Sequence, residues 1–131
     1  MSNLIKLTNI KKTFDSYKKI KVLNSVSYNF KKGKIYSLMG PSGSGKSTLL
    51  NLLSLIDRPS AGSISIENKL INYKDPNKND ILRANKIGII YQQDNLLPDF
   101  TAFENVYLAS LAAGVRKKTS ADKAYLLLKK V

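Results

Sequence analysis

One stretch of the sequence is dense in residues that suit phosphate binding: MGPSGSGKSTLL, which begins at Met39. Within it, the run from Gly40 to Ser47 fits the pattern G-x-x-x-x-G-K-[ST] of a phosphate-binding loop, or P-loop. Glycine lets the backbone turn with positive φ and bring its N–H groups close to an anion. The start of a following helix presents free amides and the positive end of its dipole to the same anion. The stretch therefore predicts a site for the phosphates of a nucleotide.

Individual residues of this loop have separate expected roles. Lys46 would reach the β- and γ-phosphates as a point charge, and the Ser47 hydroxyl would bind Mg²⁺. A flexible Gly/Ser linker is the alternative interpretation, but the strand and helix patterns on either side favour a genuine phosphate site. The predicted nucleotide-binding residues of the loop are Gly40, Pro41, Ser42, Gly43, Ser44, Gly45, Lys46, Ser47 and Thr48.

The apolar pattern predicts the elements that must position the loop. Residues 35–39 predict a short buried strand that enters the loop, and residues 47–56 predict an apolar helix that leaves it. Residues 3–9 predict a short edge strand, and the alternation at residues 25–30 predicts a half-buried strand. Strands and helices in this order predict an α/β fold.

The second half of the chain predicts further strands and helices. Residues 101–113 predict a helix that opens on a capping box, Thr101 with Glu104, and ends at Gly114. A last helix is expected from residue 120. The remaining predictions are a hairpin of residues 63–67 and 70–73, a polar loop at 75–80 and a buried strand at 87–91.

Two separate runs, GPSGSGKSTLLNLLSLIDRPSAG and IGIIYQQDNLLPDFTAFENV, resemble the P-loop and the Q-loop of ATP-binding-cassette (ABC) ATPases, in the family's order. The resemblance covers nearly the whole chain from Leu4 onward. It implies an α/β P-loop NTPase core of the ABC ATPase type with an antiparallel β edge, incomplete at the C-terminus. Residues 1–131 would then be the N-terminal part of a nucleotide-binding domain. Residues 1–92 would form the β-subdomain and P-loop core, and residues 93–131 the start of a helical subdomain.

The same resemblance implies two site residues outside the P-loop. Gln92, which follows the aromatic Tyr91, would be the Q-loop glutamine, directed at Mg²⁺ and the attacking water; Gln93 is the adjacent competitor. The catalytic residues would therefore be Lys46 and Gln92, and the metal ligands Ser47 and Gln92. Family members also stack adenine on an aromatic ring near the N-terminus, and Phe14 takes that place here. Tyr17 is a close competitor, and either ring could instead belong to the core or the surface.

The D-R-P-S-x-G segment and the Leu-Leu-Pro after the Q-loop most resemble the ATPases of lipoprotein-releasing and of macrolide- or peptide-exporting systems. This implies ATP and Mg²⁺ as cofactors, integral-membrane permease subunits as partners, a homodimer of ATPase subunits, and a place on the cytoplasmic face of the inner membrane. Four apolar residues of the following loop would contact the permease, although packing beneath the loop explains them equally well. They are Leu96, Leu97, Pro98 and Phe100.

Several family features do not occur in the sequence. It holds no LSGGQ-type signature, no Asp-Glu pair and no histidine, and its two glutamates lie in the predicted hairpin and capping box. Smaller departures are Ser54 and Asn68, where relatives often have glycine. The chain is therefore expected to be the N-terminal portion of a longer ATPase. By itself it is expected to bind ATP but to hydrolyse almost none.

Composition narrows the remaining alternatives. With no cysteine and no histidine, the chain has no disulfide, thiolate metal site, thiol nucleophile or histidine catalysis. No apolar run approaches the roughly 18 residues of a membrane span. The net charge of +13 is mostly N-terminal, because residues 1–34 hold nine lysines and one aspartate. It is the sole support for a soluble ABC-type ATPase that acts on nucleic acid; a solvated lysine-rich face explains it better, and no specific nucleic acid is expected. A non-enzymatic nucleotide-binding fragment is the other alternative.

Overall fold

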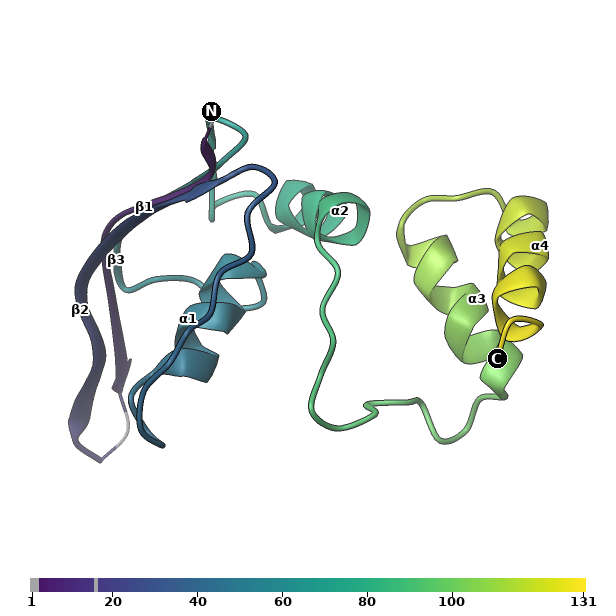
Figure 1. The fold of residues 1–131 in the computed structure, drawn as a ribbon, viewed down its shortest axis with the longest axis horizontal. Coiled ribbons are helices and arrows are strands. Elements are labelled where there is room, and N and C mark those ends of the chain that lie inside the picture. The colour runs from purple at the N-terminus through teal and green to yellow at the C-terminus, as the bar shows by residue number, and fades with distance from the viewer. Residues whose placement is uncertain (1–2, 16) are drawn as a thin grey trace. The chain divides into compact units, whose positions relative to one another are not determined.

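The computed structural model describes residues 3–15 and 17–131, and the chain forms two compact units, residues 1–79 and 80–131 (Figure 1). The boundary falls within helix α2 (Pro76–Lys86). The first unit contains a sheet and helix α1 (Lys46–Leu53). The second contains helices α3 (Ala102–Ala112) and α4 (Lys117–Leu128). No helix formed by these described residues is long and apolar enough to cross a membrane.

The first unit is built on an antiparallel sheet of four strands in the order β2-β1-β3-β4. Its apolar face, centred on the fully buried Leu7, Ile10 and Ile64, packs with Leu49 and Leu52 of α1. Figure 1 shows α1 against one face of this curved sheet. The strands are β1 (Asn3–Asp15), β2 (Lys19–Lys31), β3 (Ala61–Ile66) and β4 (Lys69–Leu70).

Strand β1 corrects the expectation of a short edge strand at residues 3–9. It is 13 residues long and lies between β2 and β3, so both of its edges are paired. The alternation is broken at Asn9, where φ is +50° and the register to β2 shifts. There the Asn9 N–H donates to the Ser27 hydroxyl at 2.8 Å in place of a regular ladder bond. A β-bulge of this kind hides a long strand from a period-two pattern.

The predicted hairpin forms, but its turn is one residue earlier than expected, and its second strand is only Lys69–Leu70 instead of residues 70–73. Ile66 pairs with Lys69, so Glu67 and Asn68 form the two-residue turn. Their φ values of +48° and +63° match a type I′ turn, which suits the right-handed twist of the flanking strands. Asparagine tolerates this conformation, so Asn68 suits the second position of the turn.

The strands predicted at residues 35–39 and 87–91 are not formed. Ile35 and Ile90 are fully exposed, and neither segment belongs to the four-stranded sheet of the described residues. A continuous apolar run indicates that a segment suits burial on both faces. A strand also needs neighbours that accept and donate its backbone hydrogen bonds, and the run itself carries no information about those neighbours. The prediction of strands at residues 35–39 and 87–91 was therefore wrong.

The polar loop predicted at residues 75–80 is also wrong, because helix α2 begins at Pro76. The Asp75 carboxylate accepts the N–H of Lys78 at 3.3 Å, as an N-cap residue does, and proline suits the first helical position. The Lys78 side chain and N–H both bond to this carboxylate, which lowers the pKa of Asp75 below its ordinary value. Asp-Pro is a recognisable helix start, so the sequence contained the information.

The second unit pairs α3 with α4, which lie side by side (Figure 1). The predicted capping box is confirmed: the Thr101 hydroxyl accepts the Glu104 N–H at 3.2 Å, and the Glu104 carboxylate accepts the Thr101 N–H at 2.8 Å. Gly114, with φ of +79°, follows the helix end as expected. Helix α4 begins three residues before the predicted start and buries the small residues Ser120 and Ala124.

Candidate functional site

The glycine-rich loop of the first unit leads directly into helix α1. The Ser44 N–H donates to the Pro41 carbonyl at 3.3 Å and closes one turn of the loop. Gly45 then caps the helix in the left-handed conformation, with φ of +89°. The loop therefore folds as a tight turn before a helix N-terminus, an arrangement that suits an anion, although residues 35–39 do not form the expected strand.

Gly45 also fixes the loop to the sheet. It is buried, and a Cβ atom at this position would lie 3.0 Å from Val22 Cγ1 and 3.1 Å from Leu23 Cδ2, both on β2. A larger residue would push the loop away from the strand. Glycine is therefore required here both for its conformation and for the close approach to β2.

The side chain of Lys46 folds back across the loop. Its ammonium donates hydrogen bonds to the carbonyl oxygens of Gly40 at 2.8 Å and Pro41 at 2.7 Å. A cation is thereby held within the curve of the loop, next to the helix start. The expected contact of Lys46 with the β- and γ-phosphates stays a prediction.

The first turn of α1 supplies further donors. The N–H groups of Lys46, Ser47 and Thr48 have no acceptor within a helix that starts at Lys46. The turn contains no acidic residue, so nothing opposes an anion there. Donors of this kind, together with the Lys46 ammonium, fit a chain of phosphate groups. The described residues contain no cluster of three or more carboxylate, histidine or cysteine groups that could hold a metal by themselves.

Phe14 and Tyr17, the two candidate rings for base stacking, differ in their surroundings. Phe14 lies on β1 opposite Ile20 of β2, and 42% of its surface is exposed. Val22, two residues after Ile20 on β2, contacts Gly45 of the P-loop. Phe14 and the P-loop therefore both contact the same part of β2. Tyr17 lies just beyond the end of β1 and is fully exposed.

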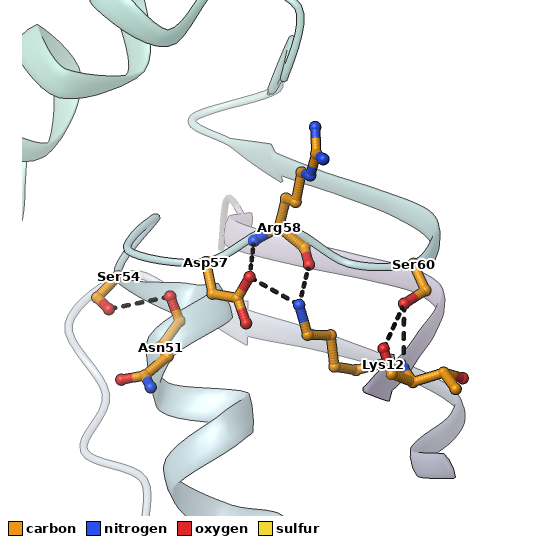
Figure 2. A network of polar contacts seen from close by, with 7 residues as sticks. Lys12, Asn51, Ser54, Asp57, Arg58 and Ser60 are labelled. Carbon is orange, nitrogen blue, oxygen red and sulfur yellow. Dashed lines mark hydrogen bonds and ion pairs between the residues drawn. The ribbon is translucent and has the colours of Figure 1, made fainter. Parts of the chain in front are cut away.

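Figure 2 shows a polar network around Lys12 that the sequence analysis did not predict. The buried Lys12 ammonium lies 2.7 Å from Asp57 Oδ1 and 2.9 Å from the Arg58 carbonyl oxygen, in the segment that follows α1. The same ammonium lies over the Phe14 ring, 4.8 Å from its centroid. Lysine and phenylalanine two residues apart on a strand share a face, and this spacing was the available indication.

Tyr73 lies close enough to Asp57 to be affected by its charge. Burial, and to a lesser extent the negative charge of Asp57, raise the pKa of the Tyr73 hydroxyl to about 12. Within the described part of the chain, this hydroxyl is buried without a hydrogen-bond partner. The Asp57 carboxylate instead accepts from Lys12 and from the Arg58 N–H at 2.7 Å.

Gln92 and Gln93 belong to the second unit, whereas the P-loop and Phe14 belong to the first. Both glutamines are exposed and lie in a bend after residues 87–91. Neither is distinguished from the other by its surroundings. The assignment of Gln92 as a ligand of Mg²⁺, directed also at the attacking water, stays a prediction.

Asn105 organises the loop after Gln93, a role that the sequence reasoning missed. Its side-chain amide donates to the carbonyls of Leu97, Phe100 and Thr101 at 3.0–3.2 Å, and its carbonyl accepts the Leu97 N–H at 2.8 Å. Beside this loop, a largely apolar groove of about 730 Å³ is lined by Leu96, Leu97, α3 and α4. An asparagine directly after a capping-box glutamate, near an irregular loop, was the available indication.

Comparison with known proteins identifies the family of this chain. The sequence model that defines the ABC transporter family matches residues 23–131 of this chain. The lipoprotein-releasing system ATP-binding protein LolD of Saccharophagus degradans is 40% identical over 98% of this chain and 57% of its own length. The ABC transporter ATP-binding protein MJ0796 of Methanocaldococcus jannaschii is 44% identical over 80% of this chain and 45% of its own.

The solved structures agree with the sequence relatives. A dimeric structure of a post-hydrolysis state of the ATP-binding cassette MJ0796, bound to ADP and Pi, superimposes with a TM-score of 0.83 at 38% identity. The match covers 95% of this chain and 56% of that one. The chain thus spans about half the length of the curated relatives it matches, and its fold is the α/β fold of these cassettes with an antiparallel sheet.

Proposed function

The chain belongs to the ABC transporter family, and from this premise we propose that its first unit binds ATP through the loop from Gly40 to Thr48. The observation that carries the proposal is the Lys46 ammonium, bonded to the Gly40 and Pro41 carbonyls beside the free amides of the helix start. An ammonium held in this way can exchange carbonyl oxygens for the more negative oxygens of a β- or γ-phosphate. The helix dipole and the amides favour the same anion.

Magnesium would accompany the nucleotide. The Ser47 hydroxyl on the first turn of α1 is a proposed ligand, and Gln92 is proposed as a second ligand because its segment resembles the Q-loop. Mg²⁺ is commonly held by few protein groups together with phosphate oxygens and water, which agrees with the lack of a carboxylate cluster in the described residues. When bound, the ion would neutralise charge on the phosphates.

The test is a calorimetric titration with Mg-ATP of the protein and of Lys46→Ala. Removal of a charged hydrogen-bond donor is expected to weaken ATP binding about 10- to 150-fold, because such contacts contribute about 1.5–3 kcal/mol. Lys34→Ala, which removes a lysine from the exposed segment before the loop, is the matched control and is expected to bind normally. Unchanged affinity in Lys46→Ala would remove the basis of the proposal.

We further propose that the complete protein couples ATP hydrolysis to export of the lipoprotein-releasing type. LolD relatives support this class, and the dimeric MJ0796 structures support a homodimer of ATPase subunits. The present residues would contribute ATP binding, while the signature and the catalytic base would come from sequence that this chain does not hold. A steady rate of phosphate release from this chain alone, abolished by Lys46→Ala, would contradict that division of roles.

The proposed partners are integral-membrane permease subunits, which the protein would contact at the cytoplasmic face of the inner membrane. Leu96, Leu97 and Phe100 are 62%, 48% and 44% exposed beside the apolar groove, as a docking surface requires. Co-purification of the permease with the protein and with Leu96→Ser tests this contact. Loss of the permease with unchanged thermal stability supports docking, whereas lowered stability with retained permease supports packing beneath the loop.

A further inference from the structure

We infer that Lys12 positions the ring on which adenine stacks: anchored by Asp57, its ammonium holds one face of Phe14 and leaves the opposite face for the base. The inference rests on the proposed nucleotide site and deepens it. It selects Phe14 over Tyr17, a choice that the sequence left open. It also assigns a function to the Lys12–Asp57 pair, which touches neither phosphate nor metal in the proposed site.

The ammonium of Lys12 is fixed on one side and directed at the ring on the other. Lys12 is only 8% exposed, and two of the three N–H donors of an ammonium are accounted for by Asp57 Oδ1 at 2.7 Å and the Arg58 carbonyl at 2.9 Å. The remaining direction faces Phe14, whose centroid is 4.8 Å away, within the range of a cation–π contact. Because the cation is largely withdrawn from water, its attraction to the ring is screened little.

The two candidate rings therefore differ in how far they are preorganised. Phe14 already has one face covered by a fixed cation, and 42% of its surface remains accessible for stacking. Tyr17 is fully exposed just beyond the strand end. A ring that is already ordered loses less rotational freedom when a base stacks on it, so the same contact contributes more to affinity.

The anchor of Lys12 also connects the ring to the P-loop helix. The segment of Asp57 and Arg58 follows α1 and is joined to β1 through Ser60 (Figure 2). The Ser60 N–H donates to the Lys11 carbonyl at 2.8 Å, and its hydroxyl accepts the Thr13 N–H at 3.0 Å.

Both ends of helix α1 are thus attached to the pair of strands β1 and β2. Gly45, at its start, contacts Val22 of β2, and Asp57, just after its end, holds Lys12 of β1. The position of the ring relative to the phosphate-binding residues is set by these two attachments. This is the requirement for a site that binds the base and the phosphates of one nucleotide.

The experiment compares ATP with inorganic tripolyphosphate, which has the phosphate chain but no base, by titration of the intact protein. Lys12→Met keeps most of the length of the unbranched side chain and removes its charge. ATP affinity is expected to fall about 3- to 30-fold, and tripolyphosphate affinity to stay within about twofold. Phe14→Ala is expected to lower ATP affinity about 5- to 150-fold, with no further loss when Lys12→Met is added. Tyr17→Ala is expected to leave both affinities unchanged.

Three controls separate positioning from charge and from folding. Lys11→Met removes a neighbouring exposed lysine of β1 and should bind both ligands normally. Lys12→Arg keeps a cation near the ring and should recover most of the ATP affinity. Since Lys12→Met leaves the Asp57 carboxylate without its ammonium, the pair Lys12→Met/Asp57→Asn repeats the comparison without a buried lone charge. Thermal unfolding of each variant establishes that it is folded.

The outcomes distinguish this inference from the proposed function. Equal losses for ATP and tripolyphosphate in both Lys12 variants would show a general structural role and overturn the inference. Loss of ATP affinity in Tyr17→Ala but not in Phe14→Ala would overturn the choice of ring. Failure of the unaltered protein to bind tripolyphosphate would instead overturn the proposed phosphate site. A selective loss for ATP that depends on Phe14 supports the positioning role.

Discussion

Gly45 packs directly against Val22: a Cβ atom at Gly45 would lie 3.0 Å from Val22 Cγ1 and 3.2 Å from the Val22 carbonyl oxygen. This contact joins Gly45, the P-loop residue that precedes α1, to the edge strand β2. The geometry of the loop therefore depends on the sheet as well as on the glycine-rich sequence. The contact with β2 should therefore contribute to the stability of the first unit, in addition to the contribution from the ability of glycine to adopt a positive φ.

Gly45→Ala is expected to destabilise the protein by about 2–4 kcal/mol, because it adds a crowded Cβ to an unfavourable positive φ. Gly43→Ala is the matched control: its φ is +78°, but a Cβ there would meet nothing within 4 Å. It should cost about 1–2 kcal/mol, from conformation alone. Urea unfolding of both variants measures the difference. Equal losses would mean that the contact with β2 contributes nothing.

Tyr73→Phe is expected to leave the free energy of unfolding unchanged or to raise it by up to about 2 kcal/mol, because the hydroxyl is buried without a partner in the described part of the chain. The substitution should also change the response to alkali. Burial and Asp57 raise the pKa of Tyr73 to about 12, above its ordinary value of 10.0. Its neutral form is thus favoured by folding, and that stability is present below pH 10 and is lost as the pH rises toward 12.

Unfolding measured at pH 8, 10 and 11.5 tests the alkaline behaviour. The unaltered protein should lose more stability between pH 10 and 11.5 than Tyr73→Phe does. Tyr17→Phe, which removes the hydroxyl of a fully exposed residue, is the control for loss of a tyrosine hydroxyl. An identical alkaline loss in Tyr73→Phe would mean that the Tyr73 hydroxyl is not held in its neutral form.

The parts of this molecule that were predictable from sequence are those fixed by local chemistry. The P-loop, the Glu67–Asn68 hairpin and the Thr101–Glu104 capping box each depend on a few adjacent residues, and each forms as a turn or helix start. The α2 helix was missed although Asp75 and Pro76 gave a local indication.

The remaining errors concern contacts between distant segments. The apolar runs at residues 35–39 and 87–91 carry no information about which strands would pair with them, and a bulge at Asn9 concealed the length of β1. In the candidate site, the loop residues could be proposed from the sequence because they form a continuous motif. The Lys12–Asp57 pair was not, because it joins residues 45 positions apart through side chains that no motif connects.

Glu104 should give the second unit a dependence on acid. Hydrogen bonds from the Thr101 N–H and hydroxyl lower the pKa of Glu104 below its ordinary value of 4.5. The ionised form is thus favoured by folding; this stability is present above pH 4.5 and is lost as the pH falls through the lowered value. In Glu104→Gln the acid component should disappear, which helix content by circular dichroism between pH 6 and 2.5 can measure.

Thr101→Ala removes the other half of the capping box and is expected to cost about 0.5–2 kcal/mol. Because both hydrogen bonds that lower the Glu104 pKa come from Thr101, the loss of the hydroxyl should also weaken the acid dependence. Thr8→Ala, at an exposed threonine of β1, serves as a control for loss of a hydroxyl. An acid transition in Thr101→Ala as large as in the unaltered protein would exclude the hydroxyl as a cause of the shift.

Asn105→Ala should loosen the loop that carries Leu96 and Leu97, because one side chain supplies four hydrogen bonds to its backbone. A loss of about 1–3 kcal/mol is expected, since backbone carbonyls and the Leu97 N–H lose their partner. Amide hydrogen exchange gives the site-specific measurement: the Leu97 amide should exchange faster. Asn85→Ala, which removes a single 2.9 Å bond from an asparagine amide to the Ile81 carbonyl within α2, should leave Leu97 unaffected. Unchanged protection of the Leu97 amide in Asn105→Ala would mean that the loop is held by its apolar residues alone. That result would favour packing of these apolar residues beneath the loop over their docking to a permease.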